Sequence, residues 1–248
     1  MHGIIFIRMC GSGIPCTDVA RLQAVVDRYM APCDGLRSHC ERCLATQRWS
    51  GSVTLMVVDA AFMSIGLNYF TAVVPAVARY EEWMNEGRAP RNLRELSVLS
   101  YEDVALLWKN RRSWHMARDA AACIVNDTDD DTAALRTWAA VAPLETWPRD
   151  PVGAVKGVGI NTYQYLRMMG GVDTSMPDKI VRRVIADIVS EAGAPLPTAG
   201  DLELISTIAR IADATGYRPI ELCWMTWMVQ SEGKTMRMDK YRELLQRI

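Results

Sequence analysis

The sequence predicts an all-α fold, and three observations support this prediction. Apolar residues recur at helical spacing along nearly the whole chain, no convincing run alternates apolar and polar residues as a strand would, and half of the 248 residues are hydrophobic. That apolar fraction excludes intrinsic disorder, and only 16 Gly and 11 Pro exclude a collagen-like or low-complexity chain. The length suffices for one large domain or two lobes with a sizeable core.

The first two expected helices cover residues 17–30 and 55–80. In the first, Leu22, Val25 and Val26 lie on one helical face. The second is apolar almost throughout, with an expected kink at Pro75. Residues 53–78 are long enough for a membrane span, but they contain several polar residues and nothing else resembles a second span. We therefore expect a buried core helix and no membrane contact.

The next helices are expected over residues 101–108, 114–125 and 133–140. Ser100 precedes an acidic pair, which suits the start of a helix. The last two helices flank an acidic cluster made of Asp127, Asp129, Asp130 and Asp131. This cluster lacks the Gly and the distal Glu of a calcium loop, so a solvated turn with an N-cap is the better interpretation.

Helical patterns continue to the end of the sequence, which gives about ten helices with short connections. The remaining helices are expected over residues 161–169, 178–191, 201–214, 218–230 and 240–246. Residues 192–200 contain two prolines and predict a loop rather than a domain linker.

Charge and cysteine content narrow the function. The 28 basic and 29 acidic residues give a net charge of −1, so binding to nucleic acid would need a local basic patch. Seven cysteines cannot all pair, and the apolar stretch 3–7 is too short for a signal peptide, so we expect free thiols in the cytosol. A metal site remains an alternative, in which Cys33, Cys40 and Cys43 are joined by Cys10, Cys16 or His39.

The most informative segment is 152–185. We expect a short helix, a tight hairpin at Gly157-Val158-Gly159, and a second helix. Backbone N–H groups at such a turn and at the following helix start suit a DNA phosphate. Five basic and two acidic residues between positions 156 and 183 supply a local patch.

Asp178 is the candidate catalytic carboxylate of this segment. It follows Pro177 at the start of a helix, where an ionised side chain is favoured. An ionised side chain there could act as a carboxylate that is aimed out of the fold. The alternatives are a purely structural N-terminal charge at Asp178, and Asp173 as the carboxylate instead.

These residues resemble the helix-hairpin-helix base-excision DNA glycosylases. Residues 156–163, KGVGINTY, are similar to the hairpin of that family, and residues 177–184, PDKIVRRV, are similar to its catalytic helix. The resemblance extends more weakly over residues 53–230. It implies a two-lobed helical fold, with an unassigned extension over residues 1–52 and a glycosylase-like domain over residues 53–248.

The resemblance also implies a function and a set of site residues. The lyase lysine of the family is Asn161 here, an amide that cannot form an imine, so a monofunctional glycosylase is expected. Its substrate would be double-stranded DNA with a modified base, its state a monomer without a cofactor, and its location the cytoplasm or the nucleoid. The expected catalytic positions are Asp178 and Asn161, and the expected DNA contacts are Lys156, Gly157, Val158, Gly159, Thr162 and Arg182. A non-catalytic helix-hairpin-helix DNA-binding protein is the alternative.

An extruded base also needs a pocket. Ser64, Asn68 and Thr71 share one face of the expected 55–80 helix and could border a cleft, or be bonded within the core. The candidate stacking platforms are Tyr69, Tyr163, Trp114 and Trp227.

Overall fold

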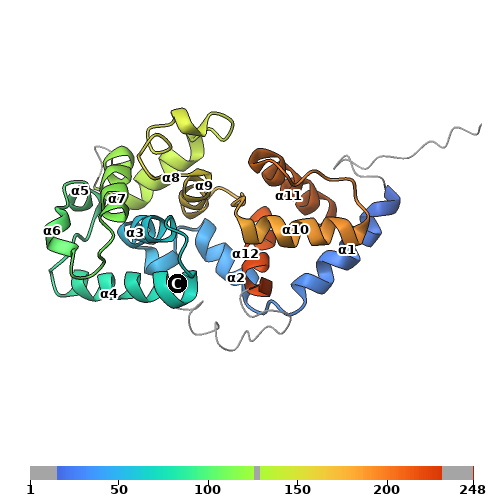
Figure 1. Ribbon diagram of the computed structural model, residues 1–248, viewed down its shortest axis with the longest axis horizontal. Helices are drawn as coiled ribbons and strands as arrows, with labels where there is room; N and C mark the ends of the chain where they lie inside the picture. The colour runs from blue at the N-terminus through green and yellow to red at the C-terminus, as the bar shows by residue number, and fades with distance from the viewer. Residues whose placement is uncertain (1–15, 126–128, 231–247) are drawn as a thin grey trace, which may run out of the picture. The chain divides into compact units, whose positions relative to one another are not determined.

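The computed structural model describes residues 16–125, 129–230 and 248, in which every regular element is a helix (Figure 1). The all-α prediction is confirmed for this part of the chain. Among the helices described, none combines the length and the apolar composition that crossing a membrane requires. The helix expected over residues 240–246, together with Cys10 and Asp127, lies outside the described residues.

Contacts divide the chain into two compact units. Of the described residues, the first unit takes in 16–40 and 173–230, and the second takes in 41–125, 129–172 and 248. The helix α2 (Leu36–Leu44) runs across the first of these boundaries. The division does not coincide with the boundary expected after residue 52, because α1 (Cys16–Met30) packs with helices from the C-terminal third of the chain.

The first unit is a small helical cluster around one apolar core. Besides α1 it contains α10 (Lys179–Ala192), α11 (Asp201–Thr215) and α12 (Pro219–Gln230). Helix α1 packs against all three, and α12 packs against both α10 and α11. Leu22 and Val26 of α1 are fully buried, as are Val184 and Ile188 of α10. The apolar stripes expected on these helices therefore do form the core.

The second unit is built around α3 (Val53–Met63), of which ten of the eleven residues are buried. Figure 1 shows α3 with α4, α7 and α9 around it, and α3 also packs against α8. The other elements are η1 (Arg48–Gly51), η2 (Tyr69–Val73), α4 (Val74–Asn85), α5 (Leu93–Leu96), α6 (Tyr101–Val104), α7 (Arg111–Ile124), α8 (Asp131–Val141), η3 (Trp147–Arg149) and α9 (Ile160–Met169).

The single helix expected over residues 55–80 is wrong, because the chain leaves α3 at Ser64 and re-enters a helix only at Tyr69. Gly66 adopts a left-handed φ of +75°, which a side chain would disfavour. Asn68 then caps η2, its side-chain oxygen accepting a hydrogen bond from the Thr71 N–H at 3.0 Å. Pro75 lies in the first turn of α4, where a proline breaks no helical hydrogen bond.

Two other expectations can be judged on the turns of this unit. The acidic segment is an N-cap turn as expected, since the Asp130 side chain accepts a hydrogen bond from the Ala133 N–H at 3.0 Å. The helix expected over residues 101–108 ends at Val104, and Asn110 starts α7 by accepting from the Ser113 N–H at 3.0 Å. Because Asn110 caps it, α7 begins at Arg111, three residues before the expected start at residue 114.

A single buried carboxylate ties four segments of the second unit together. Asp59 of α3 and Arg48 of η1 are both fully buried, and the Nη2 and Oδ2 atoms of the pair are 3.3 Å apart. The same Oδ2 atom accepts hydrogen bonds from the Trp49 indole at 2.8 Å and from the hydroxyls of Tyr69 at 2.9 Å and Tyr165 at 2.5 Å. Burial raises the pKa of Asp59, and the Arg48 charge and the hydrogen bonds from Tyr165 and Trp49 oppose this rise.

This arrangement predicts a large loss of stability when Arg48 is changed. Arg48→Met should lower the free energy of unfolding by about 3–5 kcal/mol, because it leaves the Asp59 charge buried without its partner. Urea unfolding measures the change, and Arg79→Met on the exposed side of α4 is the control. A loss no larger than that of the control would show that Asp59 does not depend on Arg48.

Candidate active site

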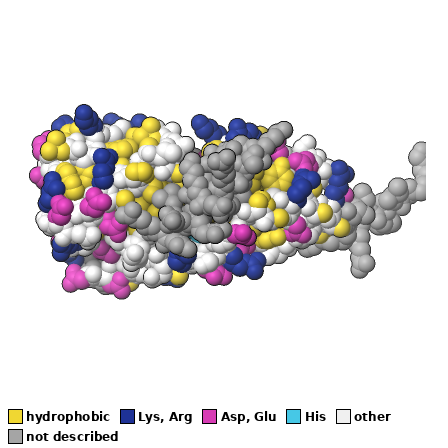
Figure 2. Space-filling view, turned by 90° about the horizontal axis from the view of Figure 1, so that it is seen from below, with side chains coloured by type: hydrophobic (Ala, Val, Ile, Leu, Met, Phe, Trp, Pro, Cys, Tyr) yellow, Lys and Arg dark blue, Asp and Glu magenta, His cyan; other side chains and the backbone are white. Residues whose placement is uncertain are grey.

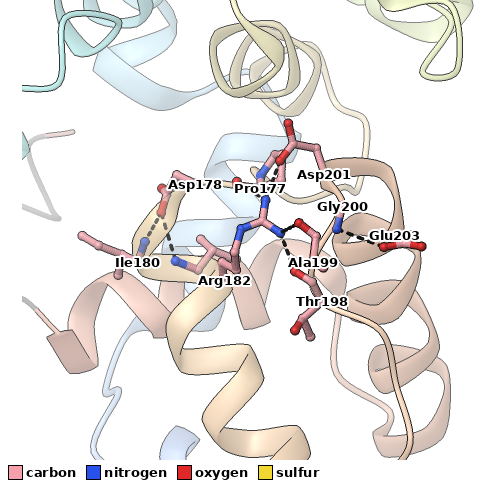
Figure 3. A network of polar contacts seen from close by, with 10 residues as sticks. Pro177, Asp178, Ile180, Arg182, Thr198, Ala199, Gly200, Asp201 and Glu203 are labelled. Atoms are coloured by element: carbon pink, nitrogen blue, oxygen red, sulfur yellow. Dashed lines mark hydrogen bonds and ion pairs between the residues drawn. The ribbon is translucent and has the colours of Figure 1, made fainter.

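Asp178 is the N-cap of α10 in the first unit. Its Oδ1 atom accepts hydrogen bonds from the N–H groups of Ile180 at 2.6 Å and Val181 at 2.9 Å (Figure 3). Because α10 is anchored by its buried apolar stripe, these two bonds fix the direction of the carboxylate. The prediction that this residue begins a helix is confirmed.

The surroundings of Asp178 perturb its ionisation. The side chain is half-buried, and burial raises the pKa of Asp178 above its ordinary value. Four groups oppose the rise: the N–H groups of Val181 and Ile180, the Trp227 side chain and the nearby Lys179 charge. The carboxylate also affects the buried thiol of Cys223. The pKa of this thiol is raised to about 12, mainly by burial and to a smaller extent by the Asp178 charge. A carboxylate with a raised pKa in a half-buried position is typical of functional sites.

Trp227 of α12 is the candidate stacking residue that lies beside Asp178, since its side chain is among the groups that lower the pKa of this carboxyl, and it is half-buried. Asp173, the alternative carboxylate, has a capping role: its Oδ1 atom accepts from the Ile220 N–H at 3.0 Å, and its Oδ2 atom pairs with Arg218 at 3.5 Å.

Arg182 is one helical turn after Asp178, and its guanidinium points back toward the start of α10. Figure 3 shows it donating to the carbonyls of Thr198 and Ala199 and pairing with the Asp201 carboxylate. A longer bond of 3.4 Å reaches the carbonyl of Pro177. Arg182 was expected to contact DNA, but its donors are directed at groups of its own unit.

The hairpin at residues 157–159 lies in the second unit. Its tight turn is present, but the short helix expected before it is not. Residues 151–157 form consecutive turns instead of a short helix, with one helical bond from the Ala154 N–H to the Asp150 carbonyl at 2.8 Å. Gly157 has a left-handed φ of +106°, as the tight turn requires. Gly159 caps α9 in an extended conformation and is exposed, without a side-chain cap for the helix. The first N–H groups of α9 therefore have no intrahelical acceptor.

Arg112 is a basic residue beside this hairpin that the sequence did not indicate. A Cβ atom built on Gly157 would lie 3.2 Å from the Arg112 Nε atom, so the exposed guanidinium of α7 borders the turn. Lys156 is exposed next to it, whereas Val158 is half-buried. Because Arg112 is far from the hairpin in the chain, only the packing of α7 could reveal this neighbour.

The remaining hairpin candidates point away from solvent. Thr162 is buried, and the Asn161 side chain is half-buried with its Oδ1 atom enclosed. Basic and acidic side chains are interspersed over the visible described surface in Figure 2, in keeping with the near-neutral net charge. A phosphate-binding role would thus depend on Lys156, Arg112 and the backbone rather than on a broad basic field.

The residues expected to line a base pocket have structural roles instead. Ser64, Asn68 and Thr71 do not share a helix face, because the chain breaks between α3 and η2. Ser64 ends α3, donating to the Ala61 carbonyl at 2.7 Å, and Asn68 caps η2. The three other candidates have buried rings whose polar atoms are satisfied internally. Tyr69 donates to Asp59 at 2.9 Å, Tyr163 to the Pro143 carbonyl at 3.0 Å and Trp114 to the Trp108 carbonyl at 2.8 Å.

The N-terminal cysteines do not gather into a metal site among the described residues. Cys33, Cys40 and Cys43 are buried, and no group of three or more His, Cys, Asp or Glu side chains in residues 16–125, 129–230 and 248 is arranged to hold a metal ion. Cys33 contacts the Tyr29 carbonyl at 3.5 Å, and His39 packs edge-on against Trp224. The metal alternative involving these residues therefore finds no support.

The raised pKa of Asp178 predicts opposite effects of two substitutions on stability. Asn keeps the cap and removes a charge that burial disfavours, so Asp178→Asn should melt at the same temperature as the parent or higher at pH 7. Asp178→Ala removes the cap and should cost about 0.5–2 kcal/mol.

The sign follows from the direction of the pKa shift. A carboxyl with a raised folded pKa binds its proton more tightly when folded, so its destabilising effect is present above the folded pKa and is lost as the pH falls through it. The advantage of Asp178→Asn should accordingly shrink on acidification. Thermal melts between pH 4 and 8 measure it, and an advantage that grows toward low pH would contradict the assignment.

Comparison of the chain with models of known families, with curated proteins and with solved structures finds no match. Any assignment of function therefore depends on the residues and contacts of this chain.

Proposed function

We propose that this chain is a monofunctional DNA glycosylase of base excision repair, which hydrolyses the N-glycosidic bond of a damaged or mismatched base flipped out of duplex DNA. The observation that carries the proposal is the half-buried Asp178 carboxylate, held at the start of α10 beside Trp227 with its pKa raised. The proposed enzyme acts as a monomer on double-stranded DNA, without a cofactor, in the cytoplasm or at the nucleoid.

The proposed chemistry needs one carboxylate and one water molecule. As the glycosidic bond lengthens, its electron pair leaves with the base and positive charge develops on the deoxyribose. The ionised Asp178 stabilises that charge, and water attacks the sugar carbon and gives a proton to the carboxylate. A raised pKa makes Asp178 a stronger base than an exposed carboxylate, which favours the proton transfer.

The residue at the position of the lyase lysine supports hydrolysis as the whole reaction. The position that would hold a lyase lysine is Asn161, whose amide nitrogen is not nucleophilic. The exposed Lys156 precedes the turn, and Lys179 is the first residue of α10. The proposed product is therefore an abasic site in an intact strand.

DNA anchoring is proposed at the hairpin of the second unit. The start of α9 offers backbone N–H groups, and Arg112 and Lys156 add positive charge beside them. Such contacts hold phosphates without selecting a sequence, which suits an enzyme that must search for a rare base.

A non-catalytic helix-hairpin-helix DNA-binding protein is the second candidate. It is favoured by one observation: both strong hydrogen bonds of Asp178 go to its own helix, as in a structural N-cap. In that case the hairpin alone would account for function, and no base would be released.

Excision separates the two candidates. The parent protein should release base from at least one of a set of duplexes carrying alkylated, deaminated, oxidised or mismatched bases, and alkali should then cleave the strand. Asp178→Asn should lower the single-turnover rate by about 10²–10⁴-fold and keep its affinity for DNA. Borohydride should trap no covalent adduct, since no imine forms.

Three results would count against this proposal. Silence of the parent protein on every duplex would favour the binding protein, and near-normal turnover of Asp178→Asn would remove this residue from the chemistry. A trapped adduct would disprove the monofunctional mechanism.

The hairpin can be tested at Gly159 without disturbing the fold. This residue is extended, and a Cβ atom built on it has no neighbour within 4 Å, so Gly159→Leu should fold normally. It should nevertheless obstruct a phosphate, weaken binding to all sequences alike and reduce the salt dependence of binding by about one counterion. Fluorescence anisotropy at several salt concentrations measures both effects. Weakening confined to DNA with a modified base would instead connect the hairpin to base recognition.

A further inference from the structure

The segment before Asp178 is held by contacts that the proposed chemistry does not use. Pro177 has no N–H group to donate, so its carbonyl is the backbone group by which this residue can be fixed. Arg182 reaches that carbonyl at 3.4 Å, while its own N–H donates to the Asp178 carbonyl at 2.9 Å. The first contact is made by the Arg182 side chain, whereas the second is the regular helical bond that any residue at this position would make.

The other partners of the Arg182 guanidinium lie in the loop before α11 and at the start of that helix. The guanidinium donates to the carbonyls of Thr198 and Ala199 and pairs with Asp201 (Figure 3). Two residues of α11 hold that loop. The Glu203 carboxylate accepts a hydrogen bond from the Gly200 N–H at 2.9 Å, and the buried Thr207 hydroxyl donates one to the Pro197 carbonyl at 2.6 Å. Arg182 therefore connects the start of α10 to the start of α11.

We infer that Arg182 is a positioning residue for Asp178, and not a ligand of DNA phosphate. This inference rests on the proposed function. The planar fork of an arginine can serve several acceptors in one plane, which a lysine ammonium cannot. The Asp201 carboxylate offsets the Arg182 charge locally, so little of that charge is left for DNA.

The test is a variant that keeps the positive charge of residue 182 but lacks the planar guanidinium. Arg182→Lys should slow single-turnover excision by about 100-fold, the cost of misplacing a catalytic group by about 1 Å, with the affinity for DNA and its salt dependence unchanged. Asp201→Ala removes one of the acceptors and should slow excision by about 10-fold. Arg21→Lys, at an exposed position of α1 in the same unit, is the matched control and should behave as the parent.

A second measurement does not depend on catalysis. The pKa of the Asp178 carboxyl, followed by NMR titration of a protein labelled at aspartate, should fall toward the ordinary value in Arg182→Lys as the side chain becomes more exposed to water. The groups that face Asp178 are Lys179, Trp227, Cys223 and the N–H groups of Ile180 and Val181, and none of them changes in this variant. Because lysine keeps the positive charge, the shift would report position rather than charge.

The outcomes of these experiments are distinct. An unchanged Asp178 pKa with a normal excision rate in Arg182→Lys would overturn the inference. Arg182 would be a phosphate ligand if Arg182→Met weakened binding to every duplex and reduced the salt dependence by about one counterion. A parent protein that excises nothing, while the pKa of Asp178 still falls in Arg182→Lys, would reject the proposed function and keep the positioning role.

Discussion

The second unit depends on the buried carboxylate of Asp59. A charge that is removed from water must be compensated inside the protein, and here the compensation comes from Arg48, Trp49, Tyr69 and Tyr165. These groups come from η1, η2 and α9, which are separate in sequence. The geometry also accounts for the backbone of η1, where Trp49 and Ser50 adopt left-handed φ values of 51° and 55°. Such a conformation is costly for residues with a side chain, and the contacts of Arg48 and Trp49 with Asp59 offset that cost.

The helical class and most helix positions could be predicted, because periodic burial is a local property of the sequence. The stripe of α10 and its start at Asp178 are examples, since proline, aspartate and apolar spacing all indicate the same boundary. The break between α3 and η2 could not be located, because the 53–78 segment is almost uniformly apolar and so carries no periodic signal. Gly66 and Asn68 decide the break through backbone conformation and capping, which compete with helix formation only in the folded context.

The candidate site divides in the same way. The carboxylate and the hairpin glycines are defined by local chemistry, so the sequence indicated them. The roles of Arg182, Arg112 and Tyr69 depend on partners from other helices. Arg182 looks like a free cation in a one-dimensional pattern, yet its partners are the loop before α11 and Asp201. Tyr69 looks like a stacking platform, yet its hydroxyl is needed by Asp59. The roles of aromatic and basic candidates are thus the hardest to predict, because their side chains can pack in the core as well as lie at the surface.

The first unit is assembled from two segments that lie far apart in the chain, residues 16–40 and 173–230, which has a consequence for synthesis on the ribosome. Residues 41–172 form a continuous unit that can fold as soon as it has emerged, whereas α1 must wait for α10, α11 and α12 before Leu22, Val25 and Val26 are covered. Until then the apolar face of α1 is exposed to water on the nascent chain, a state that is prone to aggregation. The unit that carries Asp178 is therefore completed after the helices of the second unit have been synthesised.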